Sequence, residues 1–558
     1  MMKTTISFLS LALGALFAIT PLLIHSGFFS GGWDLSLHLY HAFQVSEGIK
    51  EGVFYPRWLA LSNGGYGAPI TIFYAPLFYI LTGAVNLIIP SLVISLKAVT
   101  FFGFLLSGVT MYLFLRNFCN RMGSLVGGIA YLLLPYHIFD LYIRETLAET
   151  FAFFWLPLIL YFMYRGTREN RISYWIGMAF SYAGLVFTHL ASAYIFSFVI
   201  AAYTIFLSLR GGGGRVFLKS MAASFFGLSL SAVYFIPMLL ERKFVHIEWL
   251  KNGPWVYDRN FLFMKENSFN PFYGMVEQIV QLSVLIVIAS LVLYYYKKKT
   301  RSGFPNQDHV LFSTSVFVFT IFISTPLSKL VWELVPGLTT TLFPWRWLMI
   351  STFVIAALIG ISFDTLSFTD IKTDRTTRVT AAVFLSILIV NFYLSAVYLS
   401  VKEPMQKKDL DRIFSEGAEL IEYRPIWLVD MQKDFSQERG TLPVVFREGQ
   451  GSVEITSWKS QSRLIKAISP SAATLRISTF FYPGWTALIN GKEIPIGIEK
   501  DSGAMLLSLP SGENTVLLEF RDTPLRRAAK WISILSFFVA LSGLVIERQK
   551  RNQVRSHT

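Results

Sequence analysis

The stretch LASAYIFSFVIAAYTIFLSL (residues 190–209) carries no charged side chain and is largely apolar. At 1.5 Å per residue, a helix of this length is about 30 Å long, which matches the hydrocarbon core of a bilayer. The stretch therefore predicts a transmembrane helix. Similar apolar stretches recur along most of the chain, and this recurrence indicates a polytopic α-helical membrane protein.

The composition of the 558 residues agrees with this fold class. Hydrophobic residues make up 53% and charged residues only 15%, against a usual charged share of about 25%. The mean hydropathy of +0.50 excludes a soluble globular enzyme. The 51 Phe, 25 Tyr and 13 Trp residues exclude a disordered chain. The single cysteine, Cys119, excludes an internal disulfide and a cysteine-based zinc site.

Apolar windows predict about twelve crossings, with thirteen as the alternative. Residues 70–89 are the ambiguous window, because their crossing would place the basic loop Arg116–Arg121 outside, against the usual cytoplasmic preference of Lys and Arg. We favour twelve spans, both termini inside, and an interfacial or re-entrant segment 70–89. The predicted spans are residues 5–24, 92–115, 123–139, 150–165, 173–188, 190–209, 216–240, 276–296, 309–325, 346–366, 379–401 and 528–546.

The charge balance is strongly basic. The 49 Lys and Arg residues exceed the 35 Asp and Glu residues and give a formal net charge of +14. In a soluble domain this balance would suggest a nucleic-acid partner. Here much of the excess lies in short loops between predicted spans and in the tail Arg548–Arg555, as the positive-inside rule predicts. We therefore expect membrane lipid as a partner and no nucleic acid.

Residues 402–527 differ from the rest of the chain, because their charges are dense and their apolar residues alternate with polar ones. Leu475 and Ile477 flank Arg476, a pattern typical of a half-buried strand. The dipeptide Asn490-Gly491 lies between two such runs and predicts a hairpin with a type I′ turn. This region is expected to form a small extracytoplasmic antiparallel β-sandwich.

The predicted organisation is a multi-span membrane domain over residues 1–401, with an external loop at 25–69. The extracytoplasmic β domain follows at 402–527, then a final transmembrane helix at 528–546 and a basic cytoplasmic tail at 547–558. Ionisable groups beside membrane spans are costly unless they are paired or hydrated, so they are candidates for function.

The first external loop contains Asp34 and His38, which are four residues apart. If a helix begins here, the two side chains share one face, where a carboxylate beside an imidazole can act as a base or a metal ligand. The alternative is that Asp34 is a helix N-cap and His38 an interfacial residue.

A second cluster follows Pro135. Asp140 and Arg144 are again four residues apart, and Glu145 and Glu149 continue along neighbouring helix faces at the outer membrane surface. Arg144 either pairs with Asp140 or binds a phosphate through its planar guanidinium group. The alternative is an interfacial helix with internal ion pairs.

Two further residues stand at external ends of predicted spans. His189 ends one span, where a packed helix-end residue is the competing explanation. Arg346 lies between Trp345 and Trp347 just before another span. It either binds a lipid phosphate or extends to the interface as an ordinary anchoring residue.

Taken together, these motifs resemble the bacterial membrane proteins named 6-pyruvoyl-tetrahydropterin synthase-related, whose membrane region is related to the C-fold (GT-C) glycosyltransferases. The matching motifs are Asp34 with His38, Tyr55–Trp58, Pro135–Glu149, Thr188–Leu190 and Phe343–Arg346. Glu145 departs from the pattern, because a small residue is expected there after Arg144. The family name does not imply pterin synthesis, since that reaction needs a histidine-rich zinc site that this sequence lacks.

The resemblance implies an inverting membrane glycosyltransferase of the bacterial inner membrane. Such an enzyme moves a sugar from a polyprenyl-phosphate donor to a saccharide, lipid or protein acceptor of the cell envelope, on the external face. In the C-fold the first-loop aspartate acts as base or acceptor ligand, a role that falls to Asp34 with His38 beside it. Arg144 and Arg346 are then candidates for binding the departing phosphate, and His189 is a further candidate residue.

The second acidic site that the resemblance implies consists of Asp140, Glu145 and Glu149. Carboxylates suit Mg²⁺ or Mn²⁺, so Asp140 and Glu149 either hold such an ion or orient Arg144. The sequence leaves the metal, the sugar and the acceptor open. The rival functions are a non-enzymatic transporter or flippase for a lipid-linked saccharide, and an inactive scaffold.

Overall fold

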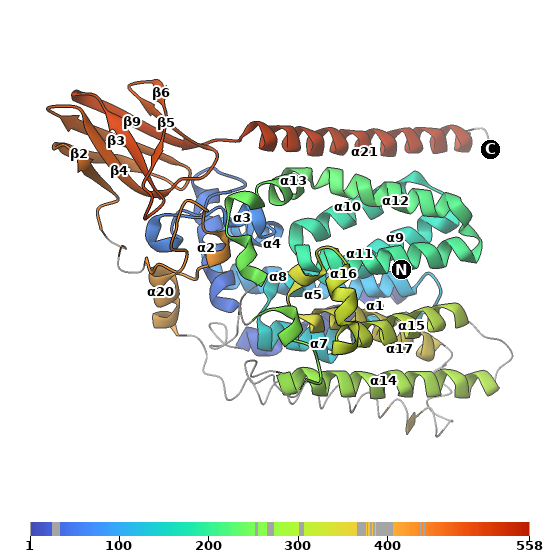
Figure 1. Cartoon of the computed structure of the whole chain (residues 1–558). Coiled ribbons are helices and arrows are strands. Elements are labelled where there is room, and N and C mark those ends of the chain that lie inside the picture. The colour runs from blue at the N-terminus through green and yellow to red at the C-terminus, as the bar shows by residue number, and fades with distance from the viewer. Residues whose placement is uncertain are drawn as a thin grey trace.

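The computed structural model describes residues 2–24, 34–251, 255–264, 273–300, 306–364, 406–435 and 441–556, with a few isolated positions between them. A bundle of helices is followed by a β domain of two sheets and then by one long final helix (Figure 1). In Figure 1 the β domain lies at the left end of the bundle, and the C-terminus lies at the opposite end.

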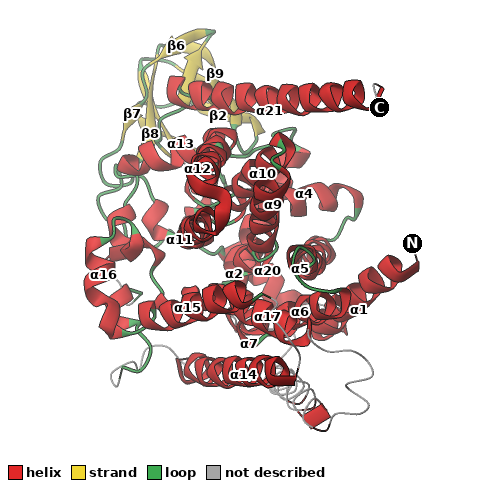
Figure 2. Ribbon diagram, turned by 90° about the vertical axis from the view of Figure 1, so that its right-hand side faces the viewer, coloured by secondary structure: helices red, strands yellow, loops and turns green. Residues whose placement is uncertain are grey.

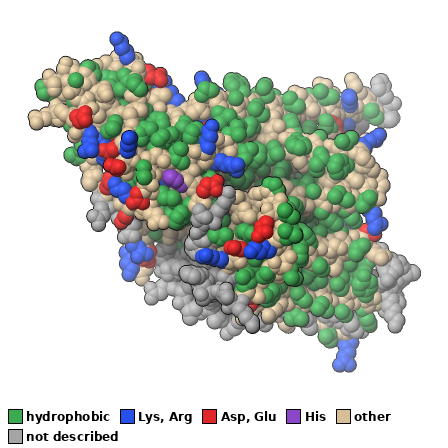
Figure 3. Space-filling view, viewed as in Figure 1, with side chains coloured by type: hydrophobic (Ala, Val, Ile, Leu, Met, Phe, Trp, Pro, Cys, Tyr) green, Lys and Arg blue, Asp and Glu red, His purple; other side chains and the backbone are tan. Residues whose placement is uncertain are grey.

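The helices of the chain are, in order, α1 (Met2–Ile24), α2 (Leu35–Lys50), α3 (Ile70–Phe73), α4 (Leu77–Ile88), α5 (Leu92–Leu115), α6 (Arg121–Leu133), α7 (Pro135–Phe139), α8 (Leu147–Ala152), α9 (Trp155–Glu169), α10 (Ile172–Thr188), α11 (Leu190–Leu207), α12 (Gly213–Leu230), α13 (Ala232–Leu240), α14 (Tyr273–Thr300), α15 (Gln307–Ile323), α16 (Lys329–Leu334), α17 (Leu348–Asp364), α20 (Lys407–Glu416) and α21 (Pro524–Ser556). The helices α14 and α21 lie on opposite outer edges of the bundle (Figures 1 and 2). A broad apolar band covers the face over α12 and α15 (Figure 3).

In the described residues, eight helical segments are long and apolar enough to cross a membrane, or nine if the bent pair α15 and α16 counts as one span. This number is smaller than the predicted twelve for identifiable reasons. Helix α10 has only 17 residues, and the segment Leu190–Leu230 counts once although it contains both α11 and α12. The predicted span 379–401 lies outside the described ranges apart from isolated positions.

The segment Leu190–Leu230 forms two helices because the chain turns at its glycines. Gly211 and Gly213 have φ values of +102° and +57°, which lie in the region that glycine adopts without steric cost. Helices α11 and α12 contact each other and lie side by side in both ribbon views (Figures 1 and 2). The two helices therefore form a hairpin with its turn at these glycines.

Residues 70–89 form the two short helices α3 and α4. Neither is among the described helices that are long and apolar enough to cross a membrane. The connection after α5 lies at the start of α1, where Arg121 Nε donates to Ser7 Oγ at 2.7 Å, and Asn120 Nδ2 donates to the Asp364 carbonyl at 2.6 Å. The favoured interpretation of residues 70–89 as an interfacial or re-entrant segment stays a prediction.

The side opposite the β domain gathers the basic loops, and we call it the basic end. Asn306 Nδ2 donates to the Phe118 carbonyl at 2.8 Å, and Arg210 forms an ion pair with Asp308. The Ser173 amide donates to Glu547 Oε2 at 3.2 Å. Loops that are far apart in the sequence therefore meet at one end of the bundle.

The β domain is a sandwich of two antiparallel sheets, as the sequence predicts. The alternating strand β4 is buried at Leu475 and Ile477, and Asn490 and Gly491 have the positive φ values, +51° and +82°, of the predicted turn. The sheet orders are β1-β4-β8-β7 and β2-β3-β9-β5-β6. The strands are β1 (Val444–Glu448), β2 (Ser452–Trp458), β3 (Ser462–Ser469), β4 (Ala473–Phe480), β5 (Trp485–Ile489), β6 (Lys492–Ile494), β7 (Gly497–Ile498), β8 (Ala504–Leu509) and β9 (Gly512–Phe520).

A tryptophan from the first loop completes the core of the sandwich. Trp58 is fully buried, and its ring centroid lies 5.5 Å from that of Phe520 and 5.6 Å from that of Trp485. Gly67 has a φ of +77° and passes directly over the indole, where a Cβ atom would lie 2.2 Å from Trp58 Nε1. The first loop and the C-terminal domain therefore share one hydrophobic core.

A buried ion pair also joins the helices to the β domain, and we call Glu241, Tyr482 and Arg526 the seam. Arg526 Nε and Nη2 donate to the two oxygens of Glu241 at 2.9 and 2.7 Å. Tyr482 Oη donates to Glu241 Oε2 at 3.0 Å. The seam ties the end of α13 to the start of α21.

Candidate functional site

The two predicted polar clusters meet at the β-domain side of the bundle. The Asp34 amide donates to the Arg144 carbonyl at 3.3 Å, so the start of α2 lies against the second cluster. Asp34 takes the N-cap position of α2, but its side chain makes no capping hydrogen bond. His38 is fully buried and is therefore not the interfacial residue of the alternative interpretation.

The second cluster is built on an irregular stretch of helix. Pro135 begins α7 at its first position, where a missing amide hydrogen costs nothing. A π-helical turn, Asp140–Arg144, follows and ends at Glu145, whose φ of +55° is left-handed. This conformation explains why a small residue is expected at Glu145, since a side chain there carries a steric cost. The chain then enters α8, which carries Glu149.

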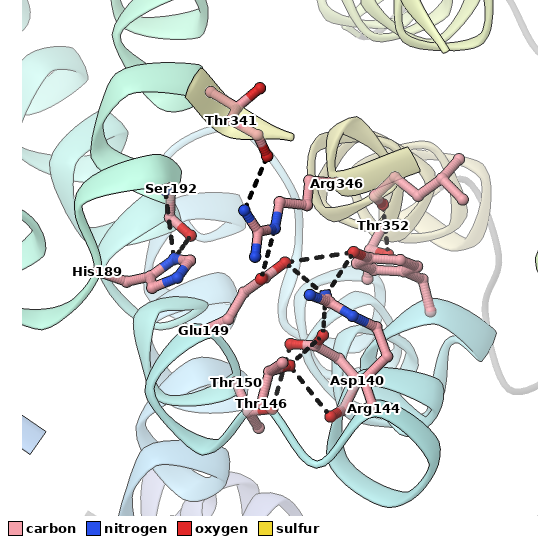
Figure 4. A network of polar contacts seen from close by, with 12 residues as sticks. Asp140, Arg144, Thr146, Glu149, Thr150, His189, Ser192, Thr341, Arg346 and Thr352 are labelled. Atoms are coloured by element: carbon pink, nitrogen blue, oxygen red, sulfur yellow. Dashed lines mark hydrogen bonds and ion pairs between the residues drawn. The ribbon is translucent and has the colours of Figure 1, made fainter. Parts of the chain in front are cut away.

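Arg144 lies between two carboxylates (Figure 4). Its Nη1 atom is 2.5 Å from Asp140 Oδ1 and 3.0 Å from Glu149 Oε1. It also donates to Tyr136 Oη at 3.2 Å. All the charged side chains of this group are buried, with 3% or less of each exposed. Arg144 therefore pairs with both carboxylates, which goes beyond the predicted pairing with Asp140.

The Asp140 carboxylate is held on both of its oxygens. Thr146 Oγ1 donates to Oδ1 at 2.5 Å, and Thr150 Oγ1 donates to Oδ2 at 3.2 Å. Together with Arg144, these bonds leave Asp140 with little capacity for another ligand. Its role in the described structure is to hold Arg144.

Arg346 reaches the same network from the opposite side (Figure 4). Its Nε atom lies 3.3 Å from Glu149 Oε2, an ion pair without hydrogen-bond geometry. Its Nη1 atom donates to the Thr341 carbonyl at 2.8 Å. The side chain is 13% exposed, against 3% for Arg144. Arg346 is therefore the more accessible and less fully bonded of the two guanidinium groups.

His189 borders the network at the start of α11. Its Nδ1 atom lies 2.6 Å from Ser192 Oγ and accepts the Ser192 amide at 3.3 Å. Accepting an amide requires an unprotonated Nδ1, so the neutral ring carries its hydrogen on Nε2. His189 thus caps α11 as a packed helix-end residue, and its role as a residue of the functional site stays a prediction.

Asp34 and His38 form the remaining side of the site. His38 Nδ1 lies 2.7 Å from Tyr79 Oη, while His38 Nε2 has no hydrogen-bond partner in the described part of the chain. Asp34 is partly exposed, and its carboxylate forms no hydrogen bond or ion pair with any described residue. Burial raises the pKa of Asp34, and the positive charges of Arg144 and Arg346 oppose only part of that effect.

Asp140 and Glu149 are the candidate ligands for a divalent cation. Within the described ranges no three His, Cys, Asp or Glu side chains are arranged to hold a metal ion. The Asp140 oxygens already bind Arg144, Thr146 and Thr150. These two carboxylates therefore do not fit a shared Mg²⁺ or Mn²⁺ ion in this arrangement, and no chemical step below uses one.

Several side chains of the site carry no signal in a single sequence. Tyr79 contacts His38 from 41 residues away, and the Thr341 carbonyl fixes Arg346 through a backbone atom. Thr146 and Thr150 lie inside the predicted cluster, but nothing in the sequence distinguishes them from its other residues. Their spacing of six and ten residues from Asp140 becomes meaningful only after the π-helical turn and α8 are known.

The sequence profile of the family described as "6-pyruvoyl-tetrahydropterin synthase related domain; membrane protein" matches residues 71–399. This match covers more than half of the chain. The chain belongs to this family of membrane proteins. The expected family is therefore confirmed. No curated protein matches the sequence of this 6-pyruvoyl-tetrahydropterin synthase-related chain.

Solved structures with a similar arrangement belong to longer chains. The apo oligosaccharyltransferase of Archaeoglobus fulgidus has a TM-score of 0.47 and 11% identity over 72% of this family member and 57% of the transferase. ArnT from Cupriavidus metallidurans, bound to undecaprenyl phosphate, has a TM-score of 0.44 and 11% identity over 64% and 60% of the two chains. The arabinofuranosyltransferase AftD from Mycobacteria has a TM-score of 0.42 and 12% identity over 69% and 26%. The chain thus spans little more than half of the first of these proteins.

Proposed function

We propose that the protein is a membrane glycosyltransferase that moves a sugar from a polyprenyl-phosphate donor to an acceptor of the cell envelope. One observation carries the proposal: a partly exposed carboxylate, Asp34, lies beside a buried network in which Arg346 keeps unused binding capacity. A base and a phosphate-binding cation are the two groups that transfer from a phosphate leaving group requires. The resemblance of the sequence motifs to those of the C-fold glycosyltransferases supports the same reaction.

Asp34 acts as the base. It accepts the proton of the acceptor hydroxyl while that oxygen attacks the anomeric carbon and the bond from this carbon to the phosphate oxygen breaks. The electron pair leaves with the polyprenyl phosphate, and a single displacement inverts the anomeric centre. The raised pKa of Asp34 makes it a stronger base than an ordinary aspartate.

The two arginines have different roles: one contacts the phosphate and the other positions the contacting residue. Arg346, the more exposed group, contacts the departing phosphate directly and balances its growing charge. Arg144 is enclosed by Asp140 and Glu149 and acts as a positioning residue that fixes Glu149. Glu149 in turn sets the orientation of Arg346.

The histidines line the acceptor side. Burial lowers the pKa of His38 well below its usual range, so its ring is neutral and Nε2 is available to the acceptor. Tyr79 fixes the ring through Nδ1. His189 closes the site at the start of α11, and Glu145 supplies further negative charge at the end of the π-helical turn.

The proposed setting is the bacterial inner membrane with the β sandwich outside. The basic end then faces the cytoplasm, in agreement with the positive-inside rule. Both termini are inside, and the site opens near the external surface under the sandwich. The polyprenyl chain lies among the helices, and the acceptor is a saccharide, lipid or protein of the envelope.

The test is turnover by the purified full chain in lipid vesicles, supplied with radiolabelled polyprenyl-phosphate sugars and an envelope fraction. Wild type releases polyprenyl phosphate and labels the acceptor fraction. Asp34→Asn lowers the rate by about 10²- to 10⁴-fold, the usual contribution of a general base. The matched control Asp501→Asn, an exposed aspartate of the sandwich, keeps the wild-type rate.

Three outcomes contradict the proposal. No transfer with any donor by a folded protein removes the glycosyltransferase activity. Passage of intact donor across the vesicle without bond cleavage indicates the rival flippase. Equal rates for wild type and Asp34→Asn remove Asp34 from the chemistry.

A further inference from the structure

A polar pocket lies at the basic end, far from the candidate site. It has a volume of about 420 Å³ and lies between the start of α10 and the C-terminal part of α21. These two helices contact each other along the outer edge of the bundle (Figures 1 and 2). The pocket is lined by Arg171, Ser173, Leu544, Glu547, Arg548, Arg551 and Asn552.

The pocket carries uncompensated positive charge. Three arginines and one glutamate line it, and the glutamate is already engaged. Glu547 accepts the Ser173 amide at 3.2 Å and lies 3.6 Å from Arg171 Nε. Arg548 and Arg551, one turn apart on α21, are exposed and form no ion pair with any residue that the structure describes. Two cations therefore remain for an added anion.

Ser173 provides a further polar group. Its Oγ atom is buried and has no hydrogen-bond partner among the described residues. The same residue lines the pocket near the N-terminus of α10, where backbone amides and the helix dipole favour negative charge. A hydroxyl without a partner beside two free guanidinium groups is the donor set of a phosphate site.

The apolar surface next to the pocket is suited to the acyl chains of a lipid. Leu544 lines the pocket, and its neighbours Val545 and Ile546 are 47% and 51% exposed on the membrane-spanning helix α21. The charged pocket therefore continues directly into apolar surface. Basic pockets of this kind at the ends of transmembrane helices suit phosphate head groups whose acyl chains follow the helix.

We propose that this pocket binds a phosphate-bearing anion, the head group of an anionic phospholipid, and that the lipid ties α21 to the start of α10. Helix α21 needs such support, because only 17% of its membrane window is buried against the rest of the chain. The helix also carries Arg526 of the seam at its other end. Lipid bound at the basic end thus stabilises the helix that anchors the β sandwich.

The experiment measures lipid binding and thermal unfolding of the full chain in phosphatidylcholine nanodiscs with increasing cardiolipin. A parallel series adds inorganic phosphate in place of cardiolipin. The test variant is Arg548→Gln/Arg551→Gln. The control Arg215→Gln/Lys550→Gln removes two exposed charges of the same sign outside the pocket.

Cardiolipin raises the unfolding temperature of wild type and control and is retained by both in native mass spectrometry. The test variant binds it about 25-fold more weakly, fivefold for each arginine. Stabilisation by inorganic phosphate equal to that by cardiolipin overturns the lipid source and assigns the pocket to free phosphate. Equal weakening in both variants, or no effect of either anion, overturns the site.

Discussion

Among the described residues, the seam and the candidate site are both buried ion-pair networks, and they are built differently. At the seam, Glu241 accepts three hydrogen bonds, two from Arg526 and one from Tyr482. At the candidate site, Arg346 meets Glu149 at 3.3 Å without hydrogen-bond geometry. Asp34, in the same site, has no side-chain partner among the described residues.

This difference separates a structural network from a binding one. A buried carboxylate that accepts hydrogen bonds at both of its oxygens has little capacity for a further ligand, and it holds together the elements that carry its donors. A network with unused donors and acceptors costs free energy in the empty protein and recovers it when a ligand binds. We therefore expect seam variants to change stability and site variants to change turnover.

The largest effect on stability is expected from breaking the ion pair of the seam. Arg526→Met leaves Glu241 buried without its cation and lowers the free energy of unfolding by about 3–5 kcal/mol. The double variant Glu241→Met/Arg526→Met loses less than either single variant, because no unpaired charge remains. Thermal unfolding of the full chain in nanodiscs measures both losses. Additive losses would show that the two side chains do not stabilise each other.

Replacing Arg346 is expected to affect donor binding rather than stability. Arg346→Lys keeps the charge but loses the planar fork, and kcat/KM for the polyprenyl-phosphate sugar falls about 10- to 100-fold. The unfolding temperature stays close to that of wild type. The control Arg447→Lys, an exposed sandwich arginine, changes neither quantity. An unchanged kcat/KM together with a large loss of stability would show that Arg346 has a structural role instead.

The charge of Asp34 is expected to cost stability, in contrast to the charges of the seam. Its pKa in the folded protein is raised above the ordinary 3.8. The folded state therefore binds the proton more tightly than the unfolded state, and ionisation destabilises the fold as pH rises. Asp34→Asn raises the unfolding temperature at pH 7, and this gain disappears below about pH 4. For wild type, kcat/KM falls on the acid side with a midpoint above about pH 4.

These two measurements also separate the roles of Asp34. A lower unfolding temperature for Asp34→Asn at pH 7 would show that the carboxylate stabilises the fold. An activity that stays constant down to about pH 4 would contradict a raised pKa in the free enzyme.

The smallest effect is expected from a partly exposed ion pair within the sandwich, between Arg476 and Glu499. Partial burial raises the pKa of Glu499, but hydrogen bonds from Arg476 and Ser502 outweigh it and hold the pKa below its ordinary value. This contribution to stability is present at neutral pH and is lost as pH falls below about 4.5. Arg476→Gln removes the extra acid sensitivity, as thermal unfolding between pH 3 and 7 would measure. Identical pH profiles for the two proteins would contradict the assignment.

Much of the architecture could be predicted from the sequence, because its signals are local. Long apolar runs predict helices, alternation around Arg476 predicts a strand, and Asn490-Gly491 predicts a turn, and all three are confirmed. The twelve predicted crossings rest on apolar windows, which do not distinguish a 17-residue helix from a full span. These windows also could not show that residues 70–89 break into two short helices.

The candidate site could be predicted only in part. Spacing brought Asp140 near Arg144, but the π-helical turn that forms this pair has no sequence signature of its own. The contact of Asp34 with Arg144 joins segments 110 residues apart and depends on how α2 packs against the bundle. The sequence does not predict that Tyr79 belongs to the site, because its hydroxyl joins the site only through its contact with His38 in the folded chain.

The insertion of Trp58 into the sandwich core constrains how the protein can be made. Trp58 leaves the ribosome nearly 400 residues before the first strand of the sandwich, so its indole has no partner during most of synthesis. A sandwich produced alone lacks this side chain and exposes the rings of Trp485 and Phe520. Closure of the shared core must therefore wait until β9, the last strand, has been synthesised. The first loop reaches its final packing only when this late domain folds around it.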